Sequence, residues 1–301
     1  MSNDLSVSDR TDGELLADGI RAAFHGAPQD GVAGLTRLLE RESSGQARWL
    51  LGVCLASSGR FGTALAALGP LTDLEEPAAS PQLRWAALAQ TTAASCLRQV
   101  GQYDWASEHD SRACRVAETE PAVAFDAWIG LAADAVGSGD VGLASERWKN
   151  AVASMSDRDW RQAVRRDWVA TEMALMTGET VTAAAASEAA VRRSRSAIAP
   201  RHLAKSLLFT GVCAIELGEP ERATLLLDEA AELASTLRLD PLVWPIESVL
   251  ARLNESESDR HRQTARSAVL RILADLPAPL ALVWEARQEI VDLIGSRNSP
   301  S

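Results

Sequence analysis

Apolar and polar positions along this chain repeat with the period of an α-helix. Leu51 and Leu55 lie four residues apart before a turn at Gly59, and Ala64 and Leu68 lie four apart after it. Residues at this spacing share one helix face, so the pattern predicts two amphipathic helices joined by a tight turn. Ala is the residue with the best helix propensity, and it fills 53 of 301 positions, against one Tyr and four Phe. The pattern therefore predicts an all-helical protein.

The same frame occurs five times. In each copy a small residue or Thr comes seven positions before a turn glycine, and an Ala comes five positions after it. The turn glycines are Gly59, Gly101, Gly139, Gly178 and Gly218, at intervals of 42, 38, 39 and 40 residues. A fixed period in this range indicates a repeat array of helical hairpins.

The residue types fit that geometry. Glycine tolerates the left-handed backbone conformation in which a helix commonly ends. The small residues fall where the two helices of a hairpin cross, and a large side chain there would push the helices apart. Because one hairpin cannot bury both of its faces, neighbouring hairpins must stack.

These residues resemble the tetratricopeptide repeat (TPR) family. The match is clearest in the third unit, which has the family's bulky, small and turn residues at Trp128, Leu131, Ala132, Gly139, Val141, Ala144, Trp148 and Ala151. The family period is about 34 residues, so the longer period here resembles the long-helix variants of bacterial regulatory and adaptor proteins. The resemblance implies a right-handed α-solenoid, with a non-enzymatic binding function as its usual use.

We expect one solenoid over residues 13–295, with the clearest repeats at 45–238 and polar tails at 1–12 and 296–301. Flanking hairpins are predicted at 14–41 and 242–276, and a last helix at 279–294 is predicted to cap the array, as terminal repeats require. The segment 74–81, with two prolines and an acidic pair, reads as a loop between hairpins.

Charge and composition narrow the partners. The net charge is −11 and the pI is about 5.0, which argues against nucleic acid, because binding to phosphates depends on Lys and Arg. No apolar stretch is long enough to cross a membrane and no secretory signal is evident, so we expect a cytoplasmic protein. The four widely spaced cysteines are expected to be reduced and structural.

Known catalytic and metal-binding patterns are missing from the sequence. It has no HExxH or Cys-His ligand spacing, no phosphate-binding GxxxxGK[ST] loop and no GxSxG elbow. The four histidines lie far apart along the chain. We therefore predict that the protein is not an enzyme and uses no cofactor.

The TPR resemblance implies a concave groove lined by the first helix of each hairpin. Transferring the groove positions gives a set of candidate partner-binding residues: Trp49, Val53, Arg98, Ile129, Arg165, Trp168, Glu172, Leu208 and Val212. For Trp49 and Trp168 the core remains an alternative to the groove. The Lys and Asn pattern of the family's clamp for chaperone tails is absent.

The leading interpretation is a scaffold or adaptor that binds a protein or peptide in this groove. A ligand-responsive regulatory module that acts on a separate effector chain is the alternative, and an enzyme built on a solenoid is the weakest. The arginine-rich segments 157–168 and 191–196 are interpreted as solvated faces, with a docking patch for an acidic partner as the alternative. The last helix, with Leu280, Val283, Ile290 and Ile294, either caps the solenoid or forms a homo-oligomer.

Overall fold

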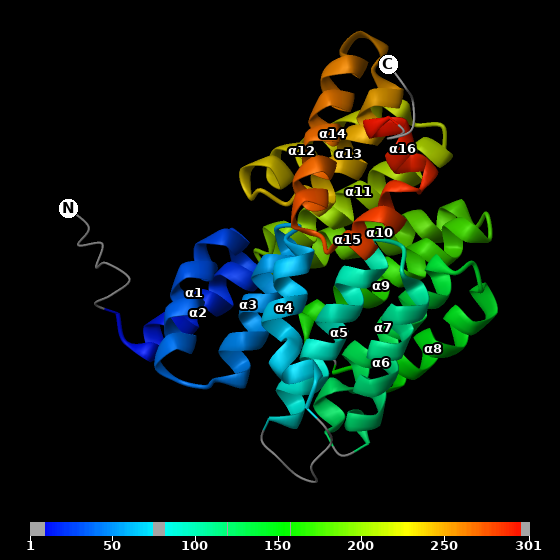
Figure 1. The fold of residues 1–301 in the computed structure, drawn as a ribbon. Coiled ribbons are helices and arrows are strands. Elements are labelled where there is room, and N and C mark those ends of the chain that lie inside the picture. Colours follow the sequence, from blue (N-terminus) through cyan, green and yellow to red (C-terminus); the bar gives the residue numbers. More distant parts are fainter. Residues whose placement is uncertain (1–9, 75–81, 119, 157, 296–301) are drawn as a thin grey trace.

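The computed structural model describes residues 10–74, 82–118, 120–156 and 158–295, and all regular secondary structure in these ranges is helical. Figure 1 shows the array, with the first hairpin at one side and the C-terminal helices stacked above the middle repeats. The first eight α-helices are α1 (Asp12–His25), α2 (Pro28–Arg41), α3 (Gly45–Ser57), α4 (Phe61–Thr72), α5 (Leu83–Gln99), α6 (Tyr103–Ala117), α7 (Ala124–Gly137) and α8 (Val141–Ala153). The others are α9 (Trp160–Met176), α10 (Thr180–Ser196), α11 (Pro200–Glu216), α12 (Pro220–Thr236), α13 (Asp240–Leu253), α14 (Ser258–Asp275), α15 (Ala278–Glu285) and α16 (Gln288–Ile294). Two 3₁₀ turns, Pro121–Val123 and Glu255–Glu257, precede α7 and α14.

The predicted turn glycines end the first helix of each hairpin. All five have a positive φ, between 74° and 83°, in the left-handed region that favours glycine. The residue after each glycine donates its amide to a carbonyl five residues back, as Arg60 does to Leu55 at 3.0 Å. The turn geometry predicted from the glycine spacing is therefore confirmed.

The small residues of the frame lie at helix crossings, as predicted. A Cβ placed on Gly52 of α3 would lie 2.4 Å from Leu68 of α4, and one on Gly211 of α11 would lie 2.7 Å from Leu227 of α12. The alanines five residues after the turns are fully buried at these crossings (Ala64, Ala106, Ala144, Ala183 and Ala223). Consecutive helices pack as antiparallel pairs, and the predicted TPR-like α-solenoid is confirmed.

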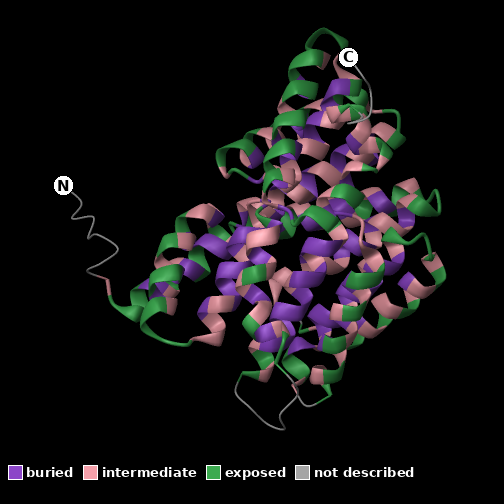
Figure 2. Cartoon of the chain, viewed as in Figure 1, coloured by how far each residue is buried: buried purple, intermediate pink, exposed green. Residues whose placement is uncertain are grey.

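The solenoid turns tightly enough that its C-terminal part returns to its N-terminal part. Asp275, the last residue of α14, accepts a hydrogen bond from the Thr63 amide in α4 at 2.9 Å, and Arg60 lies 3.8 Å from the same carboxylate. On the other side, His25 of α1 contacts the Ile198 carbonyl at 3.3 Å. The main buried cluster accordingly spans residues from Leu15 to Ile290, and Figure 2 shows the buried positions running through the inside of the array.

The C-terminal cap differs from the single predicted helix 279–294. It consists of two short helices, α15 and α16, separated at Arg287, whose backbone is extended. Trp284 and Ile290 are both fully buried. These two residues lie six positions apart and would point to different sides of one straight helix, so the break allows both to reach the core.

Three of the four residues considered for self-association pack within the chain. Leu280 is 7% exposed and Ile290 is 0% exposed, and Ile294 is half-buried against the main buried cluster, whereas Val283 is 46% exposed. The cap function is therefore the one that these side chains serve in the structure.

The tails at 1–9 and 296–301 and the loop 75–81 lie outside the described residues. Among the described helices none has the length and apolar character of a membrane span.

Candidate functional site

The concave side of the solenoid encloses a cavity of about 430 Å³. Its wall is built mainly by the first helices of successive hairpins, α3, α5, α7, α9 and α11, and is completed by residues of α1, α6 and α13. Ligand sites in proteins have volumes of about 300–1,000 Å³ and combine apolar walls with a few polar groups. The cavity is thus large enough for a small molecule or a short stretch of peptide.

Eight of the nine candidate groove residues line this cavity. They are Trp49, Val53, Arg98, Ile129, Arg165, Trp168, Glu172 and Leu208. Val212 does not line it, although it lies on the same helix as Leu208, one turn further along. The repeat frame thus places eight of its residues on the cavity wall and Val212 beyond it, and their contact with a partner stays a prediction.

Trp49 and Trp168 belong both to the core and to the cavity wall. Each is only 9% exposed, and each donates an indole hydrogen bond to the next repeat: Trp49 to Thr92 at 3.1 Å, Trp168 to Ser206 at 2.9 Å. The two alternatives left open for these residues are not exclusive. One part of each ring packs between hairpins while the remaining part faces the cavity.

Arg98, on the cavity wall, connects three helices. Its guanidinium lies 2.6 Å from Asp110 of α6 and 2.6 Å from Asp134 of α7, and it donates to the Gly130 carbonyl at 3.2 Å. Both carboxyl groups are almost completely buried. Burial raises the pKa of Asp110 well above its usual value and also raises the pKa of Asp134, against the lowering effect of Arg98. One guanidinium thus faces two acids that both resist ionisation.

A second cluster lies at the start of α9 and α11. Asp126 of α7, 2% exposed, binds both Arg161 at 2.6 Å and Arg165, and these two cations keep its pKa low despite its burial. Arg201 extends from α11 into the same cavity. It forms no ion pair with any residue that the structure describes. Burial, followed by repulsion from Arg161 and Arg165, lowers the pKa of Arg201 to about 10.

The neighbouring aromatic groups are closely packed. His202 is 2% exposed and stacks on Trp168 with ring centroids 5.5 Å apart. It also forms a T-shaped pair with Trp160, with centroids 4.9 Å apart. Its pKa lies well below the usual value because of burial and the surrounding cations, so the ring is neutral. Lys205 lies 4.5 Å from the centroid of Trp168, within cation–π range.

The candidates did not include Arg161, Arg201 and His202, which also line the cavity. The helices α9 and α11 each have 17 residues. Each begins about one turn before the first groove position that was transferred from the family, which is Arg165 in α9 and Lys205 in α11. Arg161 lies four positions before Arg165, and Arg201 four before Lys205, which places each pair on one helix face. Extending the groove stripe by one turn would have found them.

The interpretation of segment 157–168 as a solvated face was wrong for Arg161 and Arg165, which point into the cavity. It underestimated the effect of Asp126, whose buried carboxylate draws both side chains inward. Arg166 does pair away from the cavity, with Asp167. Asp167 also binds Arg193 of the second arginine-rich segment at 2.9 Å.

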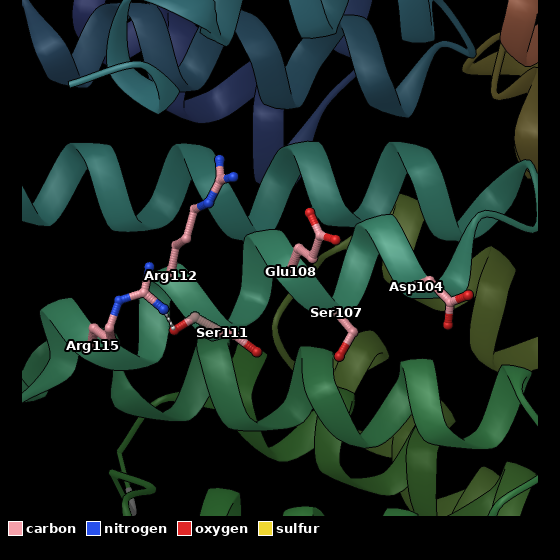
Figure 3. A pocket seen from close by; sticks show the side chains of 6 residues that line it. All are labelled: Asp104, Ser107, Glu108, Ser111, Arg112 and Arg115. Carbon is pink, nitrogen blue, oxygen red and sulfur yellow. Dashed lines mark hydrogen bonds between the residues drawn. The ribbon is translucent and has the colours of Figure 1, made fainter. Parts of the chain in front are cut away.

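A second hollow lies on the surface of α6. It is lined by Asp104, Ser107, Glu108, Ser111, Arg112 and Arg115, all from this one helix, as Figure 3 shows. A hollow formed along one helix has no opposing wall to enclose a ligand.

The four cysteines are free thiols: Cys54, Cys96, Cys114 and Cys213. Burial raises the pKa of the first three to about 12, which matches the structural role expected of them. Within the described ranges, no His, Cys, Asp and Glu residues gather in a metal-binding group.

Known structures share this architecture at low sequence identity. No protein-family model and no curated protein matches the chain. A Rap protein complexed with Competence and Sporulation Factor overlaps 96% of this chain and 80% of its own, with 11% identity and a TM-score of 0.59. NprR in complex with its cognate peptide NprX overlaps 90% of this chain and 82% of its own, with 13% identity and a TM-score of 0.55.

A tetratricopeptide repeat protein from Parabacteroides merdae ATCC 43184 overlaps 91% of this chain and 98% of its own, at 11% identity and a TM-score of 0.44. Such identities establish the fold alone. The chain is a TPR-like repeat protein by fold.

Proposed function

We propose that this chain is a non-enzymatic binding protein that holds a peptide, or a peptide-like segment of a partner protein, in its concave cavity. The observation that supports this most is the cavity wall itself. Tryptophan and aliphatic side chains form its apolar part. Arg201 lies among them, and no acidic residue in the described ranges forms an ion pair with it. Pockets of this composition suit a ligand with apolar side chains and a few polar groups.

The enclosure favours a short segment over a broad protein surface. Contacts at both edges, between α4 and α14 and between α1 and the α10–α11 turn, narrow the open side of the groove. A folded partner would have to insert a loop or tail, whereas an extended peptide could occupy the cavity directly. This restriction gives the scaffold hypothesis a defined binding mode.

A regulatory role is the second candidate, in which the ligand changes how this chain acts on a separate effector protein. Two features support it. The solenoid closes through contacts at its two edges, both polar and apolar, so a ligand that touches both sides could shift their equilibrium. In addition, NprR, which shares the fold, has a structure in complex with its cognate peptide.

Affinity purification from the source cells, followed by mass spectrometry of both peptides and proteins, tests the proposal. We compare the wild type with Leu208→Asp, which places a charge on the half-buried cavity wall. Leu225→Asp is the matched control, because Leu225 is 73% exposed on α12. Material recovered by the wild type and the control, but lost by a folded Leu208→Asp variant, supports the cavity as the binding site.

Recovery of the same material by all three proteins would move the interface away from the cavity. The regulatory candidate is tested by melting the purified protein with the recovered ligand. A ligand at about 100 times its Kd adds about 2.7 kcal/mol to the stability of the state that it binds. Failure of the ligand to change the affinity for a co-purified effector protein would refute regulation and leave binding intact.

A further inference from the structure

The start of α9 and the start of α11 bring three guanidinium groups to one end of the cavity. Arg161, Arg165 and Arg201 all line it, and Asp126 is the one carboxylate that pairs with any of them among the described residues. Three positive charges thus meet one negative charge in a partly desolvated place. The excess is notable because the whole chain carries a net charge of −11.

Two buried polar atoms at this end have no partner. The Nε of Arg201 and the Nδ1 of His202 are both inaccessible to solvent and accept or donate no hydrogen bond within the described structure. Buried polar atoms in native proteins are nearly always hydrogen-bonded, so an unsatisfied pair on a cavity wall indicates a missing partner. His202 is itself 2% exposed, held by Trp168 and Trp160, and therefore presents its ring in a fixed orientation.

A guanidinium group is suited to a carboxylate. Its planar donors match the two carboxylate oxygens, and charge-assisted hydrogen bonds of this kind are about twice as strong as neutral ones. Both carboxylate oxygens of Asp126 already accept hydrogen bonds, one from Arg161 and one from Arg165. Arg201 is therefore the guanidinium that remains for a ligand.

We propose that this end of the cavity is a carboxylate subsite, and that the ligand is an acidic peptide whose carboxylate binds Arg201 between Arg161 and His202. This inference rests on the proposed peptide-binding function and specifies its ligand. The carboxylate belongs to an Asp or Glu side chain or to the peptide C-terminus. Apolar side chains of the same peptide then contact Trp49, Leu88 and Leu208 along the remaining wall.

The test uses a synthetic library of short random peptides, presented once with free and once with amidated C-termini, and selected on the full-length protein. We compare the wild type with Arg201→Gln. The matched control is Arg166→Gln on α9, since Arg166 pairs with Asp167 and does not line the cavity. Arg201→Gln removes an uncompensated buried cation, so we expect it to melt at the same temperature as the wild type or higher.

We expect the wild type and Arg166→Gln to enrich peptides that contain Asp or Glu, or that require a free C-terminus. Affinity for the enriched peptides should fall by about 10- to 100-fold in Arg201→Gln, the loss typical of one charged hydrogen-bonded contact. Comparison of the two library forms then tells which carboxylate the subsite binds.

Enrichment of peptides with no acidic preference, or equal binding by Arg201→Gln, would overturn the carboxylate subsite while the peptide-binding function stood. Enrichment of no peptide would overturn both. Inorganic phosphate is added in a parallel melting experiment. If it stabilises the wild type and not Arg201→Gln while no peptide is enriched, the cluster is an anion site and the acidic peptide is wrong.

Discussion

At the scale of single residues, a left-handed backbone conformation occurs in the turns within hairpins and also in two of the turns between consecutive hairpins. Within hairpins it is filled by glycine, whereas Ile198 (φ 49°) and Arg238 (φ 50°) occupy it in the turns α10–α11 and α12–α13. The hydrogen bond is the same in both cases, from Glu179 to Ala174 at 2.8 Å and from Ala199 to Ser194 at 3.0 Å. A branched residue at such a φ is strained, by about 1–2 kcal/mol.

Replacing Ile198 by glycine should therefore stabilise the protein. The side chain is 78% exposed, so little burial is lost, and relief of strain exceeds the flexibility that glycine adds to the unfolded chain, for a net gain of about 0.5–1 kcal/mol. Urea unfolding at equilibrium measures it. The converse is Gly178→Ala, where an added Cβ has no neighbour within 4 Å, so no steric clash contributes. Strain in the folded state again opposes the change in flexibility of the unfolded chain, and we expect a loss of about 0.5–1 kcal/mol. A loss of stability in Ile198→Gly would show that the strain is not there.

The sequence predicted the residues whose role is set by backbone conformation or by size. Gly59 and its equivalents, and Ala64 and its equivalents, repeat because each hairpin meets the same local constraint. Arg161 and Arg201 occupy equivalent places, each seventeen residues before a turn glycine, but in an extra first turn of α9 and α11 that the transferred frame leaves out. The repeat pattern also does not show that the buried Asp126 pairs with Arg161 and not with Arg201.

At the scale of elements, the ionic cluster of Arg98, Asp110 and Asp134 joins α5, α6 and α7. Asp110 is 0% exposed, and one oxygen of each acid, Oδ1 of Asp110 and Oδ2 of Asp134, has no hydrogen-bond partner within the described structure. A proton held between the two acids would satisfy both atoms. The folded protein would then keep a proton at a pH where the unfolded chain, with Asp near pKa 3.9, has released it.

This retained proton fixes the sign of a pH effect. Because the folded state binds more protons, stability falls as pH rises from about 4 through the raised pKa of Asp110, by at most about 1.4 kcal/mol per pH unit. Asp110→Asn imitates the protonated acid and should abolish this fall, so its stability relative to the wild type should increase with pH. Urea unfolding at a series of pH values measures the difference.

The control for this series is Asp104→Asn, an exposed acid on the same helix. Its stability difference from the wild type should stay flat over the same pH range. A flat difference for Asp110→Asn as well would mean that Asp110 is ionised throughout, with Arg98 compensating both acids.

At the scale of the whole molecule, the unpredicted feature is closure. Repeat spacing predicts each hairpin and its packing on the next, because those contacts are local. The contacts of Asp275 with Thr63 and of His25 with Ile198 join residues far apart in sequence, and they depend on the accumulated twist of many hairpins. Closure also narrows the open groove into a cavity. If closure ties the two ends together, residues 13–295 should unfold as one cooperative unit, as the expected single solenoid implies.

The contact between α14 and α4 offers a direct test of closure. Arg60, at the start of α4, has no side-chain cap, and the Asp275 carboxylate accepts the Thr63 amide in its place. Removing a helix cap costs about 0.5–2 kcal/mol, so Asp275→Ala should destabilise the protein by about that amount. Asp259→Ala, on the exposed start of α14, is the control and should be nearly neutral.

If closure shapes the cavity, Asp275→Ala should also weaken binding of the ligand recovered from cells, measured by calorimetry at a temperature where both variants are folded. Unchanged affinity would separate the cap from the cavity and leave it a purely structural contact.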